Sequence, residues 1–214
     1  MKKIIHVILV CCLLIMGCSS DDSNNNNNNN NNAPTTSIPD AAFEQALIDL
    51  GLDDLLDGSV VTGNIENVTD LVVNDKGISS LVGLEDFSSL LNLRANDNDL
   101  TSLNLNQNEI LKSIFLDRNM FTQINVSNLV DLEKLSMNGN QLSSINVANN
   151  FNLQELTVPN NAIQQIDVSN NAQLTVLNVI GNPLTCIRVN AEQLTNTPAQ
   201  WQKDDEDTYA LTCN

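Results

Sequence analysis

Asparagine recurs at a fixed interval through the middle of this 214-residue chain, at Asn98, Asn119, Asn140, Asn161 and Asn182. Six further columns keep the same step and hold only apolar residues; they begin at Leu90, Leu93, Ala95, Leu100, Leu103 and Leu105. Together these columns contain 30 positions, where the chain's 42% hydrophobic content would give about 13 apolar residues by chance. A period of this length indicates a solenoid, in which each repeat buries its apolar face only against its neighbours.

The repeat reads LxxLxLxxNxLxxLxL, and residues 68–189 resemble the bacterial leucine-rich repeat family. The resemblance implies an α/β repeat solenoid made mostly of short parallel strands. A looser copy with Leu71, Val73, Ile78 and Leu81 precedes the regular ones at a slightly longer step. Lys76 occupies the asparagine position of that copy, so the row of asparagines is expected to begin one coil later.

The L-x-L alternation predicts a short strand with one buried face. Each asparagine follows where the chain must turn, and its amide can pair with backbone groups that the turn leaves unsatisfied. The unit nearly repeats within itself, because Asn108 lies almost midway between Asn98 and Asn119. We therefore expect a strand on each side of the coil, two narrow parallel sheets, and a rod of about 30 Å for six coils.

The first 17 residues predict a secretion signal: Lys2 and Lys3 precede an apolar run that is too short to span a bilayer. The stretch before Cys18 resembles the bacterial lipobox, which implies that Cys18 becomes the acylated first residue. The acidic Ser19–Asp22 segment resembles the export signal of surface lipoproteins in Bacteroidetes-type bacteria. Residues 18–37, with the Asn24–Asn32 tract, are predicted to be a flexible tether. The expected location is the outer membrane, facing the cell surface; the alternative is a plain signal peptide with an incidental cysteine.

Residues 38–67 are predicted to be an N-terminal cap over the open end of the solenoid. A helix is expected over 38–51, because Pro39 and Asp40 supply a start signal and Gly51 a stop. Phe43, Leu47 and Leu50 would share its apolar face. This segment also resembles the region before the repeats in Bacteroidetes leucine-rich repeat lipoproteins.

Residues 190–214 are predicted to be a C-terminal cap. Cys11 and Cys12 leave with the signal and Cys18 carries lipid, so Cys186 and Cys213 are expected to form a disulfide in an oxidising compartment. Cys186 lies in an outward column, which predicts that the tail folds back over the flank of the last coil. Trp201 and Tyr209 are expected to pack in this cap, with ligand stacking as the alternative role of Trp201.

The composition argues against catalysis. His6 is the single histidine and leaves with the signal, so the mature chain offers no histidine base and no histidine metal ligand. We expect no enzyme activity and no cofactor. Loss of Lys2 and Lys3 takes the net charge from −17 to −19, which argues against binding nucleic acid. We expect a turn of the cap at 53–64 and a solvated turn at 204–207, with weak calcium binding as the alternative at each.

The outward columns of the two strands differ. The second-strand column is nearly uniform, whereas the first-strand face is varied, and in the leucine-rich repeat family this face lines the concave binding surface. The candidate ligand-binding residues on it are Arg94, Phe115, Asp117, Arg118, Lys134 and Glu155. A basic cluster around Phe115 would favour a partner bearing carboxylate or sulfate groups. The alternative is an unselected surface.

The sequence thus predicts a monomeric, lipid-anchored surface protein that binds a protein ligand through its concave sheet and touches the membrane only through its lipid. A carbohydrate-capturing accessory lipoprotein and a structural spacer without ligand are the alternatives. Glycan sites usually offer several aromatic side chains, and here the sheet offers Phe115 alone.

Overall fold

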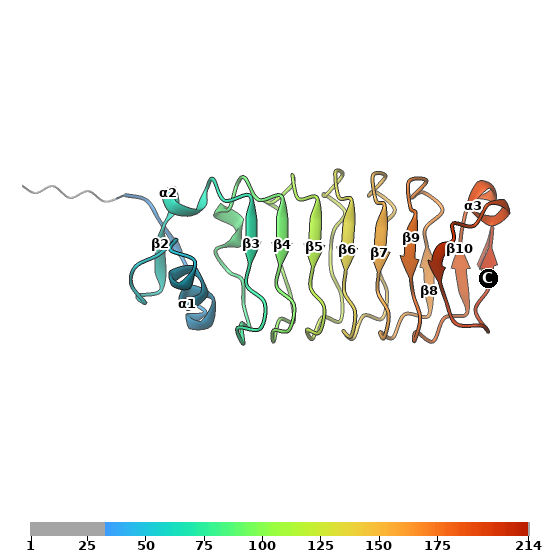
Figure 1. The fold of residues 1–214 in the computed structure, drawn as a ribbon, viewed down its shortest axis with the longest axis horizontal. Helices are drawn as coiled ribbons and strands as arrows, with labels where there is room; N and C mark the ends of the chain where they lie inside the picture. Colours follow the sequence, from blue (N-terminus) through green and yellow to red (C-terminus); the bar gives the residue numbers. More distant parts are fainter. Residues whose placement is uncertain (1–32, 214) are drawn as a thin grey trace, which may run out of the picture. The chain divides into compact units, whose positions relative to one another are not determined.

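One strand from each of seven successive coils forms a parallel sheet along one side of residues 33–213, the residues that this computed structural model describes (Figure 1). Neighbouring strands pair in register, so that Leu93 lies beside Ile114 and Leu135 beside Leu156. The arrangement confirms the predicted solenoid. The strands are β3 (Asp70–Val72), β4 (Asn92–Arg94), β5 (Ser113–Phe115), β6 (Lys134–Ser136), β7 (Glu155–Thr157), β9 (Val176–Asn178) and β11 (Gln200–Gln202).

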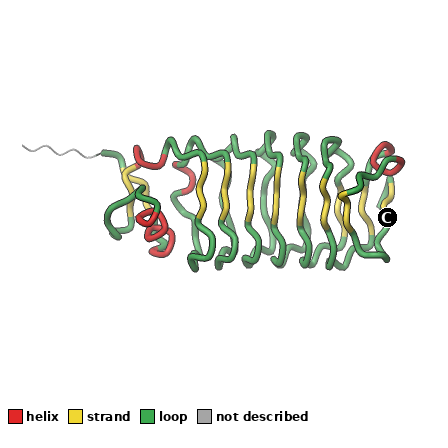
Figure 2. Tube along the Cα trace, viewed as in Figure 1, coloured by secondary structure: helices red, strands yellow, loops and turns green. Residues whose placement is uncertain are grey.

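The core of the solenoid is formed by the periodic apolar columns. All 30 positions are buried except Leu103 and Ile124, which are half-buried. Most of each coil is loop, with a strand of only three residues in the sheet (Figure 2). Such short strands hold together because every strand in the stack has a hydrogen-bonded neighbour and one fully apolar face.

The second side of the solenoid is less regular than predicted. Its sheet has only three strands, β8 (Gln165–Asp167), β10 (Cys186–Arg188) and β12 (Tyr209–Ala210), and all lie in the last coils. The expectation of a strand in every coil is wrong for the coils before β8. In one of those coils the Ser143 nitrogen lies 3.4 Å from the Thr122 oxygen, whereas the Thr185 nitrogen, at the start of the paired strands, lies 2.8 Å from the Gln164 oxygen. Strand pairing coincides with the coils that an ion pair and the disulfide hold together.

The N-terminal cap contains β1 (Thr35–Ser37), α1 (Ala41–Asp49), β2 (Ser59–Val61) and the short α2 (Thr62–Ile65). β1 and β2 pair antiparallel, so residues 35–37 belong to the cap and not to the predicted tether. Asp40 caps α1 by accepting hydrogen bonds from the nitrogens of Ala42 and Phe43, each at 3.0 Å. Leu50 does not join the buried face, because it is the C-cap residue and the chain turns away at Gly51, whose φ is 73°.

The cap is fixed to the first coil by polar and apolar contacts. The second carboxylate oxygen of Asp40 accepts from the nitrogens of Ser79 and Ser80, each at 2.9 Å. Phe43 of α1 stacks against Phe87, which follows the 3-10 helix η1 (Leu84–Asp86), with ring centroids 6.4 Å apart. Gly83 fits beneath β1 with a φ of 103°, where a Cβ would lie 2.7 Å from the Ser37 oxygen. Residues on both sides of the junction are therefore buried against each other, as a cap over the solenoid end requires.

The C-terminal segment adds a further coil to the stack. After the short helix α3 (Ala191–Thr195), β11 pairs with β9 and β12 pairs with β10. Trp201 is buried and its indole nitrogen donates to the Leu174 oxygen at 3.2 Å, while its ring lies 5.7 Å from that of Tyr209. The tail therefore extends both sheets before any of it folds back over the flank of the last coil, where all of it was expected to lie only over that flank.

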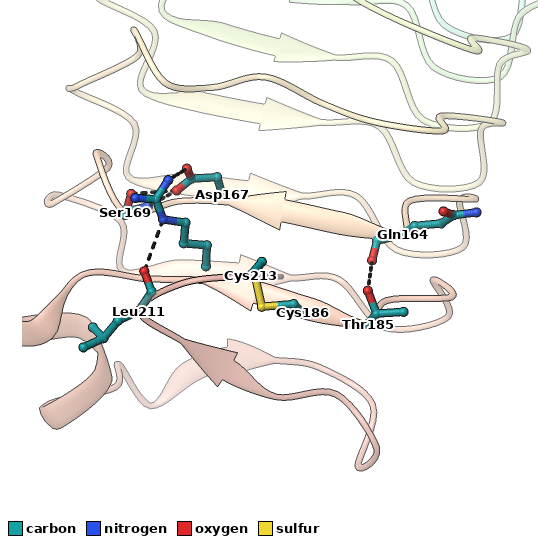
Figure 3. Close-up of a disulfide and its surroundings, with 8 residues drawn as sticks. Gln164, Asp167, Ser169, Thr185, Cys186, Leu211 and Cys213 are labelled. Carbon is teal, nitrogen blue, oxygen red and sulfur yellow. Dashed lines mark hydrogen bonds and ion pairs between the residues drawn. A yellow bond between two sulfur atoms is a disulfide. The ribbon is translucent and has the colours of Figure 1, made fainter.

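Only the last residues turn back, over the outward side of β10. The disulfide between Cys186 and Cys213 is present, with a Cα–Cα distance of 5.8 Å (Figure 3). On the same strand, Arg188 donates to the Leu211 oxygen at 3.2 Å and to Asp167 at 2.9 Å. These contacts hold the end of the chain against the last two coils.

The predicted asparagines occupy the turn after the first strand. Asn140, for example, accepts from the Phe121 nitrogen at 3.0 Å and donates to the oxygens of Leu116 at 2.9 Å and Met137 at 3.2 Å. Each amide thus connects its own coil with the preceding one. The same pattern holds for the other members, Asn98, Asn119, Asn161 and Asn182.

Candidate functional site

The outer face of the seven-stranded sheet carries the candidate ligand-binding residues. Arg94 on β4 and Phe115 on β5 are direct neighbours in register, and the guanidinium carbon lies 4.4 Å from the ring centroid. A cation held over an aromatic face at this distance is a favourable cation–π contact. The pair offers a partly exposed ring and a donor group that is already oriented.

The other cations of this face are paired with carboxylates one coil away. Lys134 lies 3.5 Å from Glu155, and Lys112 lies 3.3 Å from Glu133. Arg118 forms a two-pronged ion pair with Asp97, in which its Nη2 donates to Oδ2 at 2.6 Å. The hydrogen bond from Arg118 lowers the pKa of Asp97, and the same contact raises the pKa of Arg118.

These pairs change the expected electrostatics of the site. A basic cluster was predicted around Phe115, but Lys112, Arg118 and Lys134 are each paired with an acidic side chain one coil away. Arg94 takes part in none of the five ion pairs found among residues 33–213. On this part of the surface, Arg94 beside Phe115 is therefore the cation without an acidic partner, and the cations around it are paired with carboxylates.

Asp117 has a local structural role. Its Oδ1 accepts from the Ser136 hydroxyl at 2.6 Å and from the Asn138 nitrogen at 2.8 Å. The chain of contacts continues because the Thr157 hydroxyl donates to that of Ser136 at 2.7 Å. Small polar side chains on β6 and β7 are thus linked to Asp117 by a continuous row of hydrogen bonds.

The C-terminal end of the same face contains a hollow of about 310 Å³, lined by Thr157, Val176, Asn178, Ala199, Gln200 and Gln202. The sequence did not point to it, because Gln200 and Gln202 were assigned to the cap and not to the sheet. Their register with Val176 and Asn178 places them on the outer face of the seven-stranded sheet. The face thus has an aromatic and cationic part on β4 and β5 and an amide-lined part on β9 and β11.

The calcium alternatives can be compared with the geometry of their loops. Glu44 inserts its carboxylate into the 53–58 loop and accepts from the nitrogens of Asp57 and Ser59 at 2.8 and 3.0 Å. In the other loop, Asp204 accepts from the Gly181 nitrogen at 2.7 Å, and Asp207 accepts from the Asp204 nitrogen. Within residues 33–213, no group of three or more Asp, Glu, Cys or His side chains is arranged to hold a metal ion.

Cys18, the predicted lipidation site, and the predicted signal lie outside the described residues. Among the helices that the structure does describe, none combines the length and the apolar character needed to cross a bilayer.

No protein-family model and no curated protein matches the sequence. Solved structures match the fold. The functional domain of InlJ from Listeria monocytogenes, described as including a cysteine ladder, aligns over 85% of this chain with a TM-score of 0.68 and 24% identity. An internalin C2 from the same organism aligns over 83% with a TM-score of 0.56 and 21% identity.

A leucine-rich repeat protein of Leptospira interrogans aligns over 59% of this chain with a TM-score of 0.51 and 24% identity. The chain spans 45% of the InlJ domain, 91% of the internalin C2 chain and 34% of the Leptospira protein. At these identities the likeness concerns the fold alone. The in-register strands, the buried apolar columns and the row of asparagines show that residues 33–213 have the leucine-rich repeat fold.

Proposed function

We propose that this chain is a non-enzymatic recognition protein that binds a protein ligand through the outer face of its seven-stranded sheet. The observation that carries the proposal is the Arg94–Phe115 pair, at 4.4 Å on adjacent strands. Aromatic and arginine side chains are enriched in the cores of protein interfaces, and the few residues that dominate binding energy are often of these types. The leucine-rich repeat fold of the solved neighbours is consistent with this role.

The proposal includes anchoring by lipid at Cys18 and display at the outer membrane, and it rests on the lipobox-like sequence and the polar tract of 18–32. Several acyl chains, at about 0.8 kcal/mol per buried methylene, hold a protein on a membrane without a transmembrane helix. The tether would end at the N-terminal cap, which begins near Thr35. Both outer faces of the solenoid would then stay accessible to a partner.

The alternative ligand is a carbohydrate, and the amide-lined hollow beside Val176 favours it. Asn178, Gln200 and Gln202 offer donors and acceptors that suit hydroxyl groups. No aromatic side chain lines this hollow among the described residues, so a sugar ring would have no stacking platform there. We therefore rank a protein ligand first.

Identification of the ligand requires a capture experiment with two arms. The full-length protein is presented to surface fractions of host and bacterial cells, and in parallel to a glycan array. A protein captured by the wild type and lost with Phe115→Ala supports the proposal, and the loss should be about 2 kcal/mol if Phe115 is a hot spot. Retention of a glycan, weakened by Gln200→Ala and not by Phe115→Ala, would favour the carbohydrate alternative.

Charge variants give a second test with a built-in comparison. Arg94→Glu should weaken binding, because it removes a cation that takes part in none of the ion pairs among residues 33–213. Lys134→Gln should have a smaller effect, because Lys134 already pairs with Glu155 at 3.5 Å. Equal effects of the two changes would contradict the site as the structure describes it.

A further inference from the structure

Exposed apolar side chains lie on the turns that follow the second side of four coils, and the coil between the third and the fourth carries Ala172 and Gln173 there instead. The exposed apolar side chains are Ile110, Val130, Phe151 and Leu194, whose exposed fractions are 44, 52, 56 and 41%. We call this set the edge stripe. Phe151 is the one aromatic residue classed as exposed among residues 33–213, and no residue of the stripe belongs to the outer face of the seven-stranded sheet.

The stripe follows the stack of coils. Val130 and Phe151 occupy the same position in successive coils, and the Asn152 amide, next to Phe151, donates to the Val130 oxygen at 3.2 Å. Leu194 lies on α3, at the equivalent edge of the last coil, and the second turns and α3 lie along one edge of the solenoid (Figure 1). From Ile110 to Leu194 is four coil steps, or about 19 Å at the usual spacing between strands.

The backbone beneath the stripe is held by buried amides. Asn150 donates to the oxygens of Val126 at 2.9 Å and Leu129 at 2.7 Å, and Asn171 donates to the Val147 oxygen at 3.0 Å. Gln193 serves the last coil in the same way. These contacts fix the turns before any partner arrives, so binding there would require little ordering of the protein.

Acidic residues flank the stripe. Glu109 and Asp131 are exposed beside Ile110 and Val130, and neither belongs to any ion pair found among the described residues. Glu192 is exposed beside Leu194 at the other end. The stripe is thus an apolar row with negative charge at both ends, on a chain whose net charge is −17.

Exposed rows of apolar side chains bordered by charged residues often mark interaction sites. Here the negative charge beside the stripe decides which kinds of partner could bind there. A second copy would bring two acidic rims together, and an anionic membrane would be repelled. The polar tract Asn24–Asn32 offers no apolar side chain to cover the row. We propose that the edge stripe docks a basic amphipathic helix of a partner protein, with apolar residues along one side and lysine or arginine flanking them.

The dimensions agree with such a partner. A helix rises 1.5 Å per residue, so about 13 residues cover the roughly 19 Å of the stripe. Apolar residues at i, i+4 and i+7 would meet Ile110, Val130 and Phe151, which lie one coil apart. The next residue on that side of the helix, at i+11, lies about 16.5 Å from the first and reaches toward Leu194, two coils beyond Phe151. This docking site is separate from the sheet face on which the proposed function rests, so the two can be tested independently.

The test uses the full-length protein and a fluorescent synthetic peptide of about 14 residues, with leucine at that spacing and lysine at its flanks; the matched peptide carries glutamate in place of lysine. Fluorescence anisotropy should show binding of the lysine peptide only. Phe151→Ser with Val130→Ser should weaken it about tenfold or more. Glu109→Gln with Asp131→Asn should weaken it several-fold and flatten its salt dependence.

Two control variants locate the site. Met120→Ser removes an exposed apolar side chain outside the stripe, and Phe115→Ala changes the sheet face; both should bind as the wild type does. No binding up to about 1 mM peptide, equal binding of both peptides, or insensitivity to the Phe151 and Val130 changes would overturn the proposal. A dimer in sedimentation, or binding to phosphatidylcholine vesicles, that is lost with Phe151→Ser would assign the stripe to another occupant and also overturn it.

Discussion

The side-chain oxygen of Asn140 lies 3.0 Å from the backbone nitrogen of Phe121, in the preceding coil. The amide nitrogen of Asn140 serves two further carbonyl oxygens, at 2.9 and 3.2 Å. Asn140→Ala should therefore leave several buried backbone groups unpaired and lower the free energy of unfolding by about 1–3 kcal/mol or more. Urea unfolding followed by circular dichroism measures this loss.

Asn146→Ala is the matched comparison for Asn140→Ala. Asn146 faces water, but its side chain accepts from the Ala148 nitrogen at 3.0 Å, in a turn that Asn104, Asn125 and Asp167 also make. The change should cost no more than about 1 kcal/mol, as loss of an exposed hydrogen bond does. Equal losses for the two variants would contradict the assigned register.

Asp40 should connect the stability of the cap to pH. Burial raises the pKa of Asp40, but hydrogen bonds from Ser79, Phe43 and Ser80 outweigh it and hold the pKa below its usual value of 3.8. A lowered pKa in the folded state stabilises the protein above about pH 4, and this contribution is lost as the pH falls through the folded-state value. Asp40→Ala should cost about 1–2 kcal/mol at pH 7.

Urea unfolding of the wild type and Asp40→Ala, at pH 7 and again near pH 3, tests that assignment. The difference in stability should be smaller at the lower pH, because the protonated carboxyl no longer accepts hydrogen bonds as an anion. If the stability difference between the wild type and Asp40→Ala increased at the lower pH, the assigned role of the Asp40 carboxylate would be contradicted. Gln45→Ala, on the exposed side of α1, is the control.

The disulfide between Cys186 and Cys213 joins positions that are 27 apart in the sequence. The chain-entropy model gives about 3.5 kcal/mol for a loop of that length. The double variant Cys186→Ala with Cys213→Ala should therefore unfold at lower denaturant concentration, and peptide mapping without reduction should recover the linked pair from the wild type. Recovery of both cysteines as free, alkylatable thiols would refute the closure of this cap.

Cys18→Ala should release the protein from the membrane fraction, because the proposed anchor is the lipid on this residue. Cell fractionation followed by immunoblotting measures the shift. The matched control is Ser19→Ala, which keeps the cysteine. A Cys18→Ala protein that stays in the membrane fraction after a high-salt wash would show that the anchor lies elsewhere.

The periodic columns predicted the solenoid well, because each apolar position has to face the same core in every coil. The asparagine row was predictable for the same reason. A second row of amides, Asn108, Asn150, Asn171 and Gln193, was missed, although the first three follow the same repeat step. Leu129 interrupts this row and Gln193 is displaced by one position, so the column is not uniform in sequence.

The pairing of the basic residues near Phe115 with acidic ones could have been predicted from the sequence. Lys112, Arg118 and Lys134 each lie one repeat away from an acidic partner in the sequence, and side chains at that spacing are cross-strand neighbours in a solenoid. Reading the columns for charge would have shown the neutralisation of the basic cluster. By contrast, β11 could not be found by periodicity. The insertion of α3 shifts the register, so that Trp201 pairs with Leu177 where the repeat step alone would place Pro198.

A photo-crosslinking residue at position 115 tests the central claim, recognition through the outer face of the seven-stranded sheet, most directly. The same residue at position 125, on the second side of the solenoid, serves as the comparison. After exposure of each protein to surface fractions and illumination, mass spectrometry should find one partner protein linked to position 115 and absent from position 125. A partner linked to position 125 alone, or to neither position, would contradict recognition through this sheet.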